Sequence, residues 1–422
     1  MREMKDSGVE WIGEIPAGWS IVKVKYTGQF ENGLTYSPND VSDERGILVL
    51  RSSNIQSGKL DFNDCVYVLD VPESLMVKCG DIVICSRNGS VDLVGKSVYI
   101  DHNIVATFGA FMMRYRTKIF GKFAFYMLQP VITHYKSFFT TSTINQLTIK
   151  TIRQMLVPIP PIAEQNAIAS YLDDKCSNID TIITKNEQII EKLKEYKSSL
   201  ITETVTKGLN PDVEMKNSGV EWIGEIPAEW KAIKLKYVIK IENGINPQTE
   251  GNIPVYGSGS ESFKTCGEYK EGPAVLLGRK GTINIPRYIE GKYWNVDTVF
   301  SVTTISFMLK LKFFYYVSTC FDYSFYNLQT TLPSMTQTNY NNMFIPLPPL
   351  TEQIAIAAYL DEKCSKIDAN IKNRELIIQK LAEYKKSIIY EVVTGKKEAV
   401  YRQCFIRKIE GEIKNGNIFK SE

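Results

Sequence analysis

The sequence has little of what a zinc protein or a disulfide-stabilised protein needs. Its 422 residues include only two histidines, His102 and His134, and its eight cysteines are scattered, with no C-x-x-C pair. Structural zinc sites use closely spaced cysteines and histidines, so a metal site is not expected. We expect the thiols to be reduced and mostly packed in the interior.

Long apolar runs are also missing. No run approaches the ~18 residues that a membrane-spanning helix requires. The first ten residues, MREMKDSGVE, lack the apolar core of a secretory signal, so we expect a cytoplasmic protein. A hydrophobic content of 44% is too high for a disordered chain, and the length allows two or three domains.

Recognisable catalytic motifs are absent. The stretch GSVDLVGKS at residues 89–97 resembles a phosphate-binding loop, but it has five residues between Gly89 and Gly95 where four are needed. The residues after it look like a strand, whereas that loop requires a helix. We found no dinucleotide fingerprint, nuclease cluster or hydrolase triad. This favours a reader or a scaffold over an enzyme.

What the chain does contain is an internal repeat. The stretch SGVEWIGEIPAGW at residues 7–19 returns as SGVEWIGEIPAEW at residues 218–230, an offset of 211. The stretch VPIPPIAEQNAIASYLDDKCSNID at residues 157–180 returns as IPLPPLTEQIAIAAYLDEKCSKID at residues 345–368, an offset of 188. Each copy therefore has a Trp-rich phrase, a variable block, a Pro-rich stop and a helix.

Two long helices are predicted, at residues 162–207 and 350–394. Neither range contains Gly or Pro, while a proline stands immediately before each range and a glycine immediately after. Apolar residues recur every seven positions, which predicts a coiled coil with a polar residue in the middle of each strand. An alternative is that both polar residues, Asn186 and Arg374, face solvent. The predicted seam comprises Leu172, Ile179, Ile182, Asn186, Ile189, Leu193, Tyr196, Leu360, Ile367, Arg374, Ile377, Leu381 and Tyr384.

An antiparallel pairing of these helices explains the repeated phrase. At ~1.5 Å per residue each helix is about 65 Å long, so the second helix would return to finish near residue 1. Each copy of the phrase would then meet the C-terminal end of a long helix. We expect Trp11 and Trp222 to be the apolar anchors of this docking.

The two variable blocks read as short strands joined by tight turns, with one helix near 120–138 and another near 307–321. Residues 20–156 carry 15 Lys/Arg against 11 Asp/Glu, and residues 231–344 carry 12 against 8, so each block is +4. Two separate basic blocks indicate a polyanion bound at two places. Ordinary solubilising lysines are the alternative.

One turn aligns between the blocks. An apolar strand runs into CSRNGS at residues 85–90 and into LGRKGT at residues 277–282. An arginine, a tight glycine and a hydroxyl supply donors for phosphates and for guanine edges, although solvated arginines in turns are common. The candidate DNA-binding residues here are Arg87, Asn88, Ser90, Arg279, Lys280 and Thr282.

A second polar cluster is LRSSNI, in which Arg51 and Asn54 could pair with guanine and adenine. Its positional counterpart is VYGSGS, with Tyr256 and Ser258. The alternative is that Asn54 only caps a turn. The neighbouring aromatics Tyr293 and Trp294 could stack on a base, but such a pair in a strand is also typical of a core.

The paired motifs resemble those of the specificity (S) subunits of type I restriction-modification enzymes. The doubled P-x-P-P-x-x-E-Q at 158–165 and 346–353 and the doubled Trp-rich phrase carry the resemblance, which covers about residues 6–397. It implies an α+β fold with an internal pseudo-twofold repeat. Two globular target recognition domains with small twisted sheets are separated by two long helices that form an antiparallel coiled coil.

The resemblance also implies a function. Each recognition domain reads half of a bipartite DNA target, and the coiled coil sets the spacing. The chain holds no cofactor; two modification subunits would carry S-adenosylmethionine and methylate adenine, and a restriction subunit would use ATP and Mg. A coiled-coil scaffold without a DNA-reading role is the alternative.

The expected segments are a first recognition domain at 1–156 with a docking segment at 6–19, a long helix at 157–208, a second recognition domain at 209–344 with the repeated segment at 217–230, a second long helix at 345–397, and an unassigned tail at 398–422.

Overall fold

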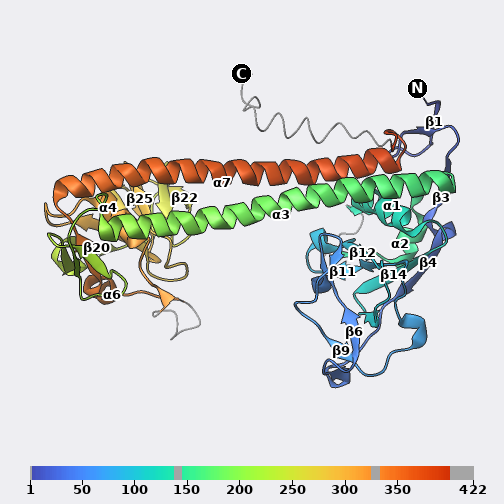
Figure 1. The fold of residues 1–422 in the computed structure, drawn as a ribbon, viewed down its shortest axis with the longest axis horizontal. Coiled ribbons are helices and arrows are strands. Elements are labelled where there is room, and N and C mark those ends of the chain that lie inside the picture. The colour runs from blue at the N-terminus through green and yellow to red at the C-terminus, as the bar shows by residue number, and fades with distance from the viewer. Residues whose placement is uncertain (1, 137–144, 325–332, 400–422) are drawn as a thin grey trace. The chain divides into compact units, whose positions relative to one another are not determined.

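The computed structural model describes residues 2–136, 145–324 and 333–399. The chain divides into two compact units. Unit 1 runs to Thr184 and resumes at Ile378, and unit 2 is Lys185–Ile377 (Figure 1). Each unit therefore contains a globular domain and parts of both long helices. The tail from residue 400 onward, including Cys404, lies outside the described residues.

The long helices form where the sequence predicts them. Helix α3 spans Ile162–Lys207 and helix α7 spans Leu350–Val393. Gly208 and Gly395 follow with φ of +80° and +75°, a left-handed conformation that glycine adopts without steric cost. Both helix ends are therefore set by the residues that the sequence places there.

The helices run antiparallel within each unit. In unit 1, Lys385 Nζ lies 2.6 Å from Asp180 Oδ1. In unit 2, Lys197 Nζ lies 2.7 Å from Asp368 Oδ1, and Arg374 Nη1 donates to Asn186 Oδ1 at 2.8 Å. As residue numbers rise along α3 in these contacts they fall along α7, which confirms the predicted direction.

The buried seam is narrower than predicted. Leu172, Ile179, Asn186, Leu360 and Ile367 are at most 8% exposed, and Leu193, Arg374 and Leu381 are half-buried. The burial of Asn186 and its bond with Arg374 favour the register-fixing interpretation over the solvent-facing one. The buried residues of the long helices also include Cys176, Ile190 and Cys364, which are not part of the predicted seam.

The apolar residues interleaved with the main heptad positions are more exposed than the prediction requires. A straight helix drifts by ~20° per seven residues relative to a strict heptad, so a second row of apolar residues turns outward. These residues are 36–57% exposed and lie outside the buried seam: Ile182, Ile189, Tyr196, Ile377 and Tyr384.

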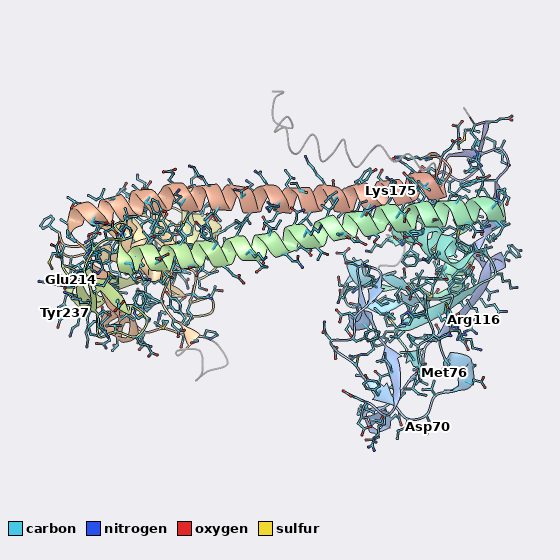
Figure 2. All side chains as sticks on the ribbon, in the orientation of Figure 1. Asp70, Met76, Arg116, Lys175, Glu214 and Tyr237 are labelled. Carbon is cyan, nitrogen blue, oxygen red and sulfur yellow. The ribbon has the colours of Figure 1, made fainter. Side chains whose placement is uncertain are left out.

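The globular domain of unit 1 contains two four-stranded sheets, in the order β12-β10-β14-β4 and β13-β6-β9-β5. Helix α1 covers the sheet β12-β10-β14-β4 and lies against α3, where Lys122 and Tyr126 bond to Asp173 (Figures 1 and 2). The elements are β1 (Met4–Asp6), β2 (Glu14–Pro16), β3 (Ser20–Lys23), β4 (Gly28–Asn32), β5 (Val41–Ser42), β6 (Ile47–Leu50), β7 (Ile55–Gln56), β8 (Lys59–Leu60), β9 (Tyr67–Val68), β10 (Asp81–Cys85), β11 (Arg87–Asn88), β12 (Ser97–Tyr99), β13 (Ala106–Phe108), β14 (Met112–Thr117), α1 (Gly121–His134), β15 (Asn145–Gln146), α2 (Ile149–Gln154) and β16 (Leu156–Ile159).

Unit 2 repeats the topology of the sheet β12-β10-β14-β4 with a diverged sequence. In its other sheet the parallel pair of strands lies in the middle, whereas in unit 1 it lies at one edge. The sheets of unit 2 have the order β25-β24-β27-β20 and β22-β21-β26-β23, so β20, β27, β24 and β25 correspond to β4, β14, β10 and β12. The elements are β17 (Met215–Asn217), β18 (Glu225–Pro227), β19 (Lys231–Lys234), β20 (Ile239–Asn243), β21 (Ile253–Tyr256), β22 (Ser262–Cys266), β23 (Lys270–Glu271), β24 (Ala274–Gly278), β25 (Arg287–Ile289), β26 (Lys292–Asn295), β27 (Val299–Thr304), α4 (Leu311–Ser318), α6 (Gln337–Asn342) and β28 (Phe344–Leu347).

The repeated phrase forms the turn and second strand of the hairpins β1–β2 and β17–β18 and ends in a buried tryptophan. Trp19 Nε1 donates to Glu164 Oε2 at 2.9 Å, and Trp230 Nε1 donates to Glu352 Oε2 at 2.8 Å. A side chain added at Gly395 would collide with Pro16 and approach Trp19, and one added at Gly208 would approach Trp230. Each of these tryptophans therefore sits at the start of one long helix and the end of the other.

The predicted anchors pack against the same two cores as these buried tryptophans. Tyr390 Oη donates to the Trp11 carbonyl at 2.8 Å, and the Trp11 ring is 6.4 Å from the Tyr390 ring. Trp222 packs edge-on against Phe321 at 5.8 Å. Both are half-buried, so the tryptophan at the end of each phrase makes the deeper contact.

The Glu-Gln motif at the start of each long helix joins three parts of its unit. Gln353 Oε1 accepts from the Lys310 amide, at the N-terminus of α4, at 2.8 Å, and Gln353 Nε2 donates to the carbonyls of Met308 and Pro348, both at 2.8 Å. Gln165 makes equivalent bonds to the Phe120 amide and the Pro160 carbonyl. The motif thus fixes the domain helix, the Pro-rich strand and, through its glutamate, the repeated phrase.

Replacing Gln353 with methionine tests this role. The change keeps the length of the side chain but leaves the Lys310 amide and two carbonyls without partners, so unfolding of unit 2 should need about 3 kcal/mol less free energy. Denaturant titration measures the difference. The exposed Gln188→Met on α3 is the control, expected within about 0.5 kcal/mol of the parent. Equal losses in both variants would contradict the assignment.

Candidate nucleic-acid interface

The two arginine turns occupy equivalent places. In unit 1 the Arg87 amide donates to the Phe111 carbonyl at 3.1 Å, and the Leu147 amide donates to the Ser86 carbonyl. In unit 2 the Arg279 amide donates to the Thr298 carbonyl at 2.9 Å, and the Met335 amide donates to the Arg279 carbonyl. Each turn follows the central strand β10 or β24 and is held between two other segments. Backbone pairing corrects the alignment made from sequence by one residue, because Arg87 corresponds to Lys280 and Arg279 corresponds to Ser86.

Both guanidinium groups are oriented by neutral partners. Arg87 Nη2 donates to Gln146 Oε1 at 2.9 Å and the group lies over the Phe111 ring. Arg279 Nη1 donates to the Asp297 carbonyl at 3.1 Å and the group lies over the Phe300 ring. Both side chains are half-buried, and in the described part of the chain neither has a carboxylate partner within 4 Å. Their positive charge is available to an anion or a base edge.

The other turn residues differ in accessibility. Ser90, Lys280 and Thr282 are exposed. Asn88 is half-buried; its Oδ1 accepts from the Ser90 amide at 3.0 Å and its Nδ2 donates to Ser52 Oγ at 3.4 Å. Asn88 is thus engaged inside the turn, whereas the other three present free surface.

The second polar cluster lies beside each turn, but its members have different roles. Asn54 is fully buried; its Oδ1 accepts from the Arg51 amide and its Nδ2 donates to the carbonyls of Asp61 and Asp64. Arg51 pairs with Asp64 at 2.8 Å. The structure gives Asn54 the turn-holding role that the sequence left as an alternative, because no donor or acceptor of its amide faces solvent.

In unit 2 the corresponding loop contacts the turn directly. A Cβ placed on Gly281, which has φ of +81°, would lie 3.2 Å from Ser258 Oγ. Tyr256 is half-buried with the Arg287 guanidinium 5.3 Å from its ring. Tyr293 is 1% exposed and shares a 2.6 Å hydrogen bond with Ser301, which makes it a core residue, and Trp294 donates to the Ile245 carbonyl.

The structure adds Gln146, Lys96 and Arg287 to the residues around the turns. Lys96 Nζ donates to the Ser52 carbonyl and to Gln56 Oε1, both at 3.3 Å. Lys96 belongs to the stretch that imitates a phosphate-binding loop, and Arg287 begins a strand. Neither position carries a sequence signal for this role, because the contacts join segments far apart in the chain.

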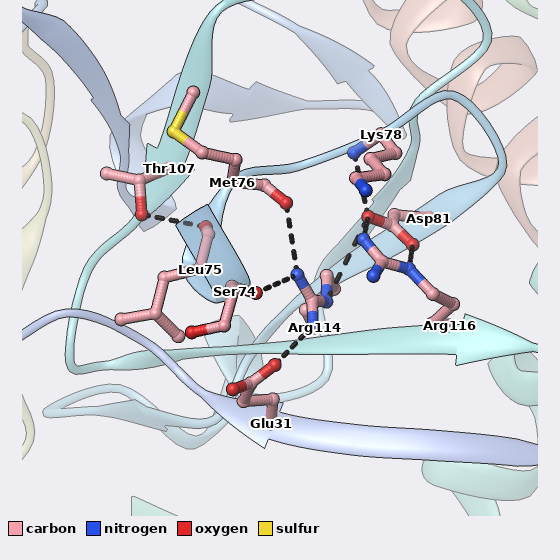
Figure 3. A network of polar contacts seen from close by, with 9 residues as sticks. All are labelled: Glu31, Ser74, Leu75, Met76, Lys78, Asp81, Thr107, Arg114 and Arg116. Atoms are coloured by element: carbon pink, nitrogen blue, oxygen red, sulfur yellow. Dashed lines mark hydrogen bonds and ion pairs between the residues drawn. The ribbon is translucent and has the colours of Figure 1, made fainter. Parts of the chain in front are cut away.

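Unit 1 also contains a buried charge network that has no counterpart among the described residues of unit 2 (Figure 3). Asp81 is 1% exposed and accepts from Arg116 Nε and Nη2, both at 2.7 Å. Arg114 donates to the carbonyls of Ser74 and Met76 and pairs with Glu31. Burial lowers the pKa of Arg114, and the bond with Asp81 raises the pKa of Arg116. Ser301 takes the position of Arg114 in unit 2.

This network accounts for part of the first basic block. Arg114 and Arg116 are two of the cations counted in the first block, yet they compensate internal carboxylates and hold the 74–76 segment. Because Glu31 and Asp81 belong to the same block, the network removes two cations and two carboxylates together and leaves the net +4 unchanged.

No three His, Cys, Asp or Glu side chains come together to hold a metal ion within residues 2–136, 145–324 and 333–399. The seven cysteines of those ranges are all free thiols, four of them buried. None of the described helices combines the length and apolarity of a membrane span.

Comparison with known proteins decides the family. The model of the type I restriction modification DNA specificity domain matches residues 16–195 and again residues 227–398. The chain belongs to this family. The two matches coincide with the two copies of the repeat, and each covers a globular domain together with a large part of its long helix.

Two relatives of the family illustrate the range of similarity. The EcoKI specificity subunit of Escherichia coli K12 is 32% identical over 45% of this chain and 43% of its own length. The putative MjaX specificity subunit of Methanocaldococcus jannaschii is 26% identical over 91% of this chain and 95% of its own length. The chain thus aligns with less than half of the E. coli protein and with nearly all of the archaeal one.

A solved structure shares the fold. A chain from a study of complex assembly and conformational transition in the type I R-M system superposes with a TM-score of 0.69, at 16% identity, over 91% of this chain and 99% of that one. The α+β architecture of the specificity family therefore extends over nearly the whole chain.

Replacing Asp81 with asparagine tests the internal network. Removing its charge leaves Arg116 without its carboxylate and leaves the buried Arg114 with Glu31 as its one anion among the described side chains, so the free energy of unfolding should fall by about 3 kcal/mol. The matched control is Asp43→Asn, which breaks an exposed pair with Arg45 and should cost at most about 0.5 kcal/mol. Thermal or denaturant unfolding measures both. A loss for Asp81→Asn no larger than for the control would show that the network is not a stabilising unit.

Proposed function

We propose that the chain is a noncatalytic DNA-specificity subunit of a type I restriction-modification complex. Each unit reads one half of a bipartite duplex target. The observation that carries this proposal is the pair of equivalent turns, Arg87 to Ser90 and Arg279 to Thr282, each with an oriented guanidinium that has no carboxylate partner among the residues the structure describes. Membership of the specificity family supports it.

The chemistry of reading follows from these donors. A guanidinium can donate two parallel hydrogen bonds to O6 and N7 of guanine in the major groove, or it can bind a phosphate. Gln146 and the Asp297 carbonyl restrict Arg87 and Arg279 before DNA arrives, so less side-chain entropy is lost on binding. Since the surroundings of the two turns differ, the two half-sites should differ in sequence.

Methylation and cleavage would lie in partner subunits. In this proposal two modification subunits, which carry S-adenosylmethionine, dock on α3 and α7, and a restriction subunit uses ATP and Mg. The long helices would set the spacing between half-sites. Two linked readers bind more tightly than either alone, because the second contact is effectively intramolecular.

The test is a selection of DNA from a random duplex library, followed by the binding of selected and scrambled duplexes at several salt concentrations. We use the full-length chain co-expressed with modification subunits of the same host. The proposal predicts enrichment of two unlike half-sites at a fixed spacing. Binding that depends on salt but not on sequence would overturn the reading role, and a lack of DNA binding would favour a scaffold.

Arg279→Ala and Arg87→Ala refine the assignment. If Arg279 reads guanine, its loss should cost about 1–3 kcal/mol at one base pair of one half-site and leave the other half-site unchanged. Arg87→Ala is the matched variant and should affect only the other half-site. Affinity measured by anisotropy for every single-base variant of the target checks both. A uniform loss over all sequences would instead identify a phosphate contact.

A further inference from the structure

Arg287 is a buried cation without an anionic partner in the described part of the chain. It is 9% exposed, and burial lowers its pKa. Its Nη1 and Nη2 atoms donate to the carbonyls of Gly259 and Gly257, and its guanidinium lies over the Tyr256 ring. Burying a charge is costly unless it satisfies specific groups, so the contacts of Arg287 with this loop have to offset that cost.

The loop that Arg287 holds consists of small residues. Residues 257–260 are Gly-Ser-Gly-Ser, which have almost no side chain to pack and high conformational freedom. Arg287 binds two alternate carbonyls of this loop. Between them lies Ser258, whose hydroxyl approaches Gly281 of the arginine turn. Arg287 therefore fixes the loop at the point where it meets the proposed reading turn.

The sheet itself does not require an arginine at this position. Arg287 pairs with Leu276 as Val98 of unit 1 pairs with Val83, so the structural equivalent of Arg287 is a buried valine. Unit 1 holds its own loop with a different cation, because Lys96 donates to the Ser52 carbonyl from the residue just before β12. The same task is thus performed from neighbouring positions of equivalent edge strands.

We propose that Arg287 is a positioning residue for sequence specificity: it fixes the 257–260 loop beside the turn at 279–282 and so shapes the second reading surface without touching DNA. Lys96 does the same for the loop after β6 in unit 1. This inference rests on the proposed function, since it concerns the same reading surfaces.

The experiment compares base preferences of two variants, Arg287→Met and Lys96→Met, in the library selection described above. Arg287→Met should reduce discrimination at the half-site read by unit 2 by about tenfold, because two carbonyls lose their donors and the loop gains freedom. Lys96→Met should relax the other half-site. Each variant is therefore the control for the other, and each retains one intact half-site as an internal standard.

Arg287→Lys separates positioning from general stability. Lysine keeps the charge and can satisfy one carbonyl, so discrimination should recover to within about threefold of the parent. A purely structural role would instead lower affinity equally for all sequences, in step with the melting temperature. If Arg287→Met does not fold, the partial loss in Arg287→Lys decides the question alone.

The outcomes distinguish the two proposals. If the parent chain selects no half-sites, the proposed function fails. If the parent selects two half-sites and both Arg287 variants keep the parental base preferences, or if both half-sites relax together, the positioning role of Arg287 is overturned.

Discussion

The antiparallel pairing of α3 with α7 is the constraint on which the rest of the structure depends. Each long helix contributes residues to both units. The core of each unit therefore includes helix segments that are far apart in the sequence. Unit 1 packs Ile388, Ile389 and Val392 from the end of α7 into the same core as Trp19 and Leu172. Unit 2 packs Ile201 and Val205 from the end of α3 into the core that contains Trp230 and Leu360. A parallel pairing would leave both cores without these residues.

The Glu-Gln motif translates that pairing into fixed domains. Glutamate accepts the indole proton of a tryptophan, and glutamine bonds the first turn of the domain helix and the Pro-rich strand. Because the glutamine is buried and both of its polar atoms are hydrogen-bonded, the motif specifies one arrangement. The sheets can then diverge in sequence while the frame that carries them stays the same. A reader of DNA needs this combination, since specificity changes in loops and turns on a constant support.

Prediction from sequence succeeded where the signal is local or repeated. The ends of α3 follow from Pro161 and Gly208, and the meeting of Asn186 with Arg374 follows from the seven-residue period. A heptad count predicts Ile189 and Tyr384 in the seam, whereas both are exposed, because the count ignores the drift of a straight helix. Arg287 could not be predicted, since its burial depends on a loop some thirty residues away along the chain. The same limit applies to Asn54, because a side-chain amide can either contact a base or hold a turn.

Zero-length cross-linking tests the central claim most directly. A carbodiimide joins a carboxylate to an amine only when the two are in contact, and the structure brings Lys385 to Asp180 and Lys197 to Asp368. Peptide mapping of the cross-linked monomer should find both isopeptide bonds. Cross-links that join the N-terminal half of α3 to the N-terminal half of α7, with neither expected pair present, would contradict the antiparallel arrangement.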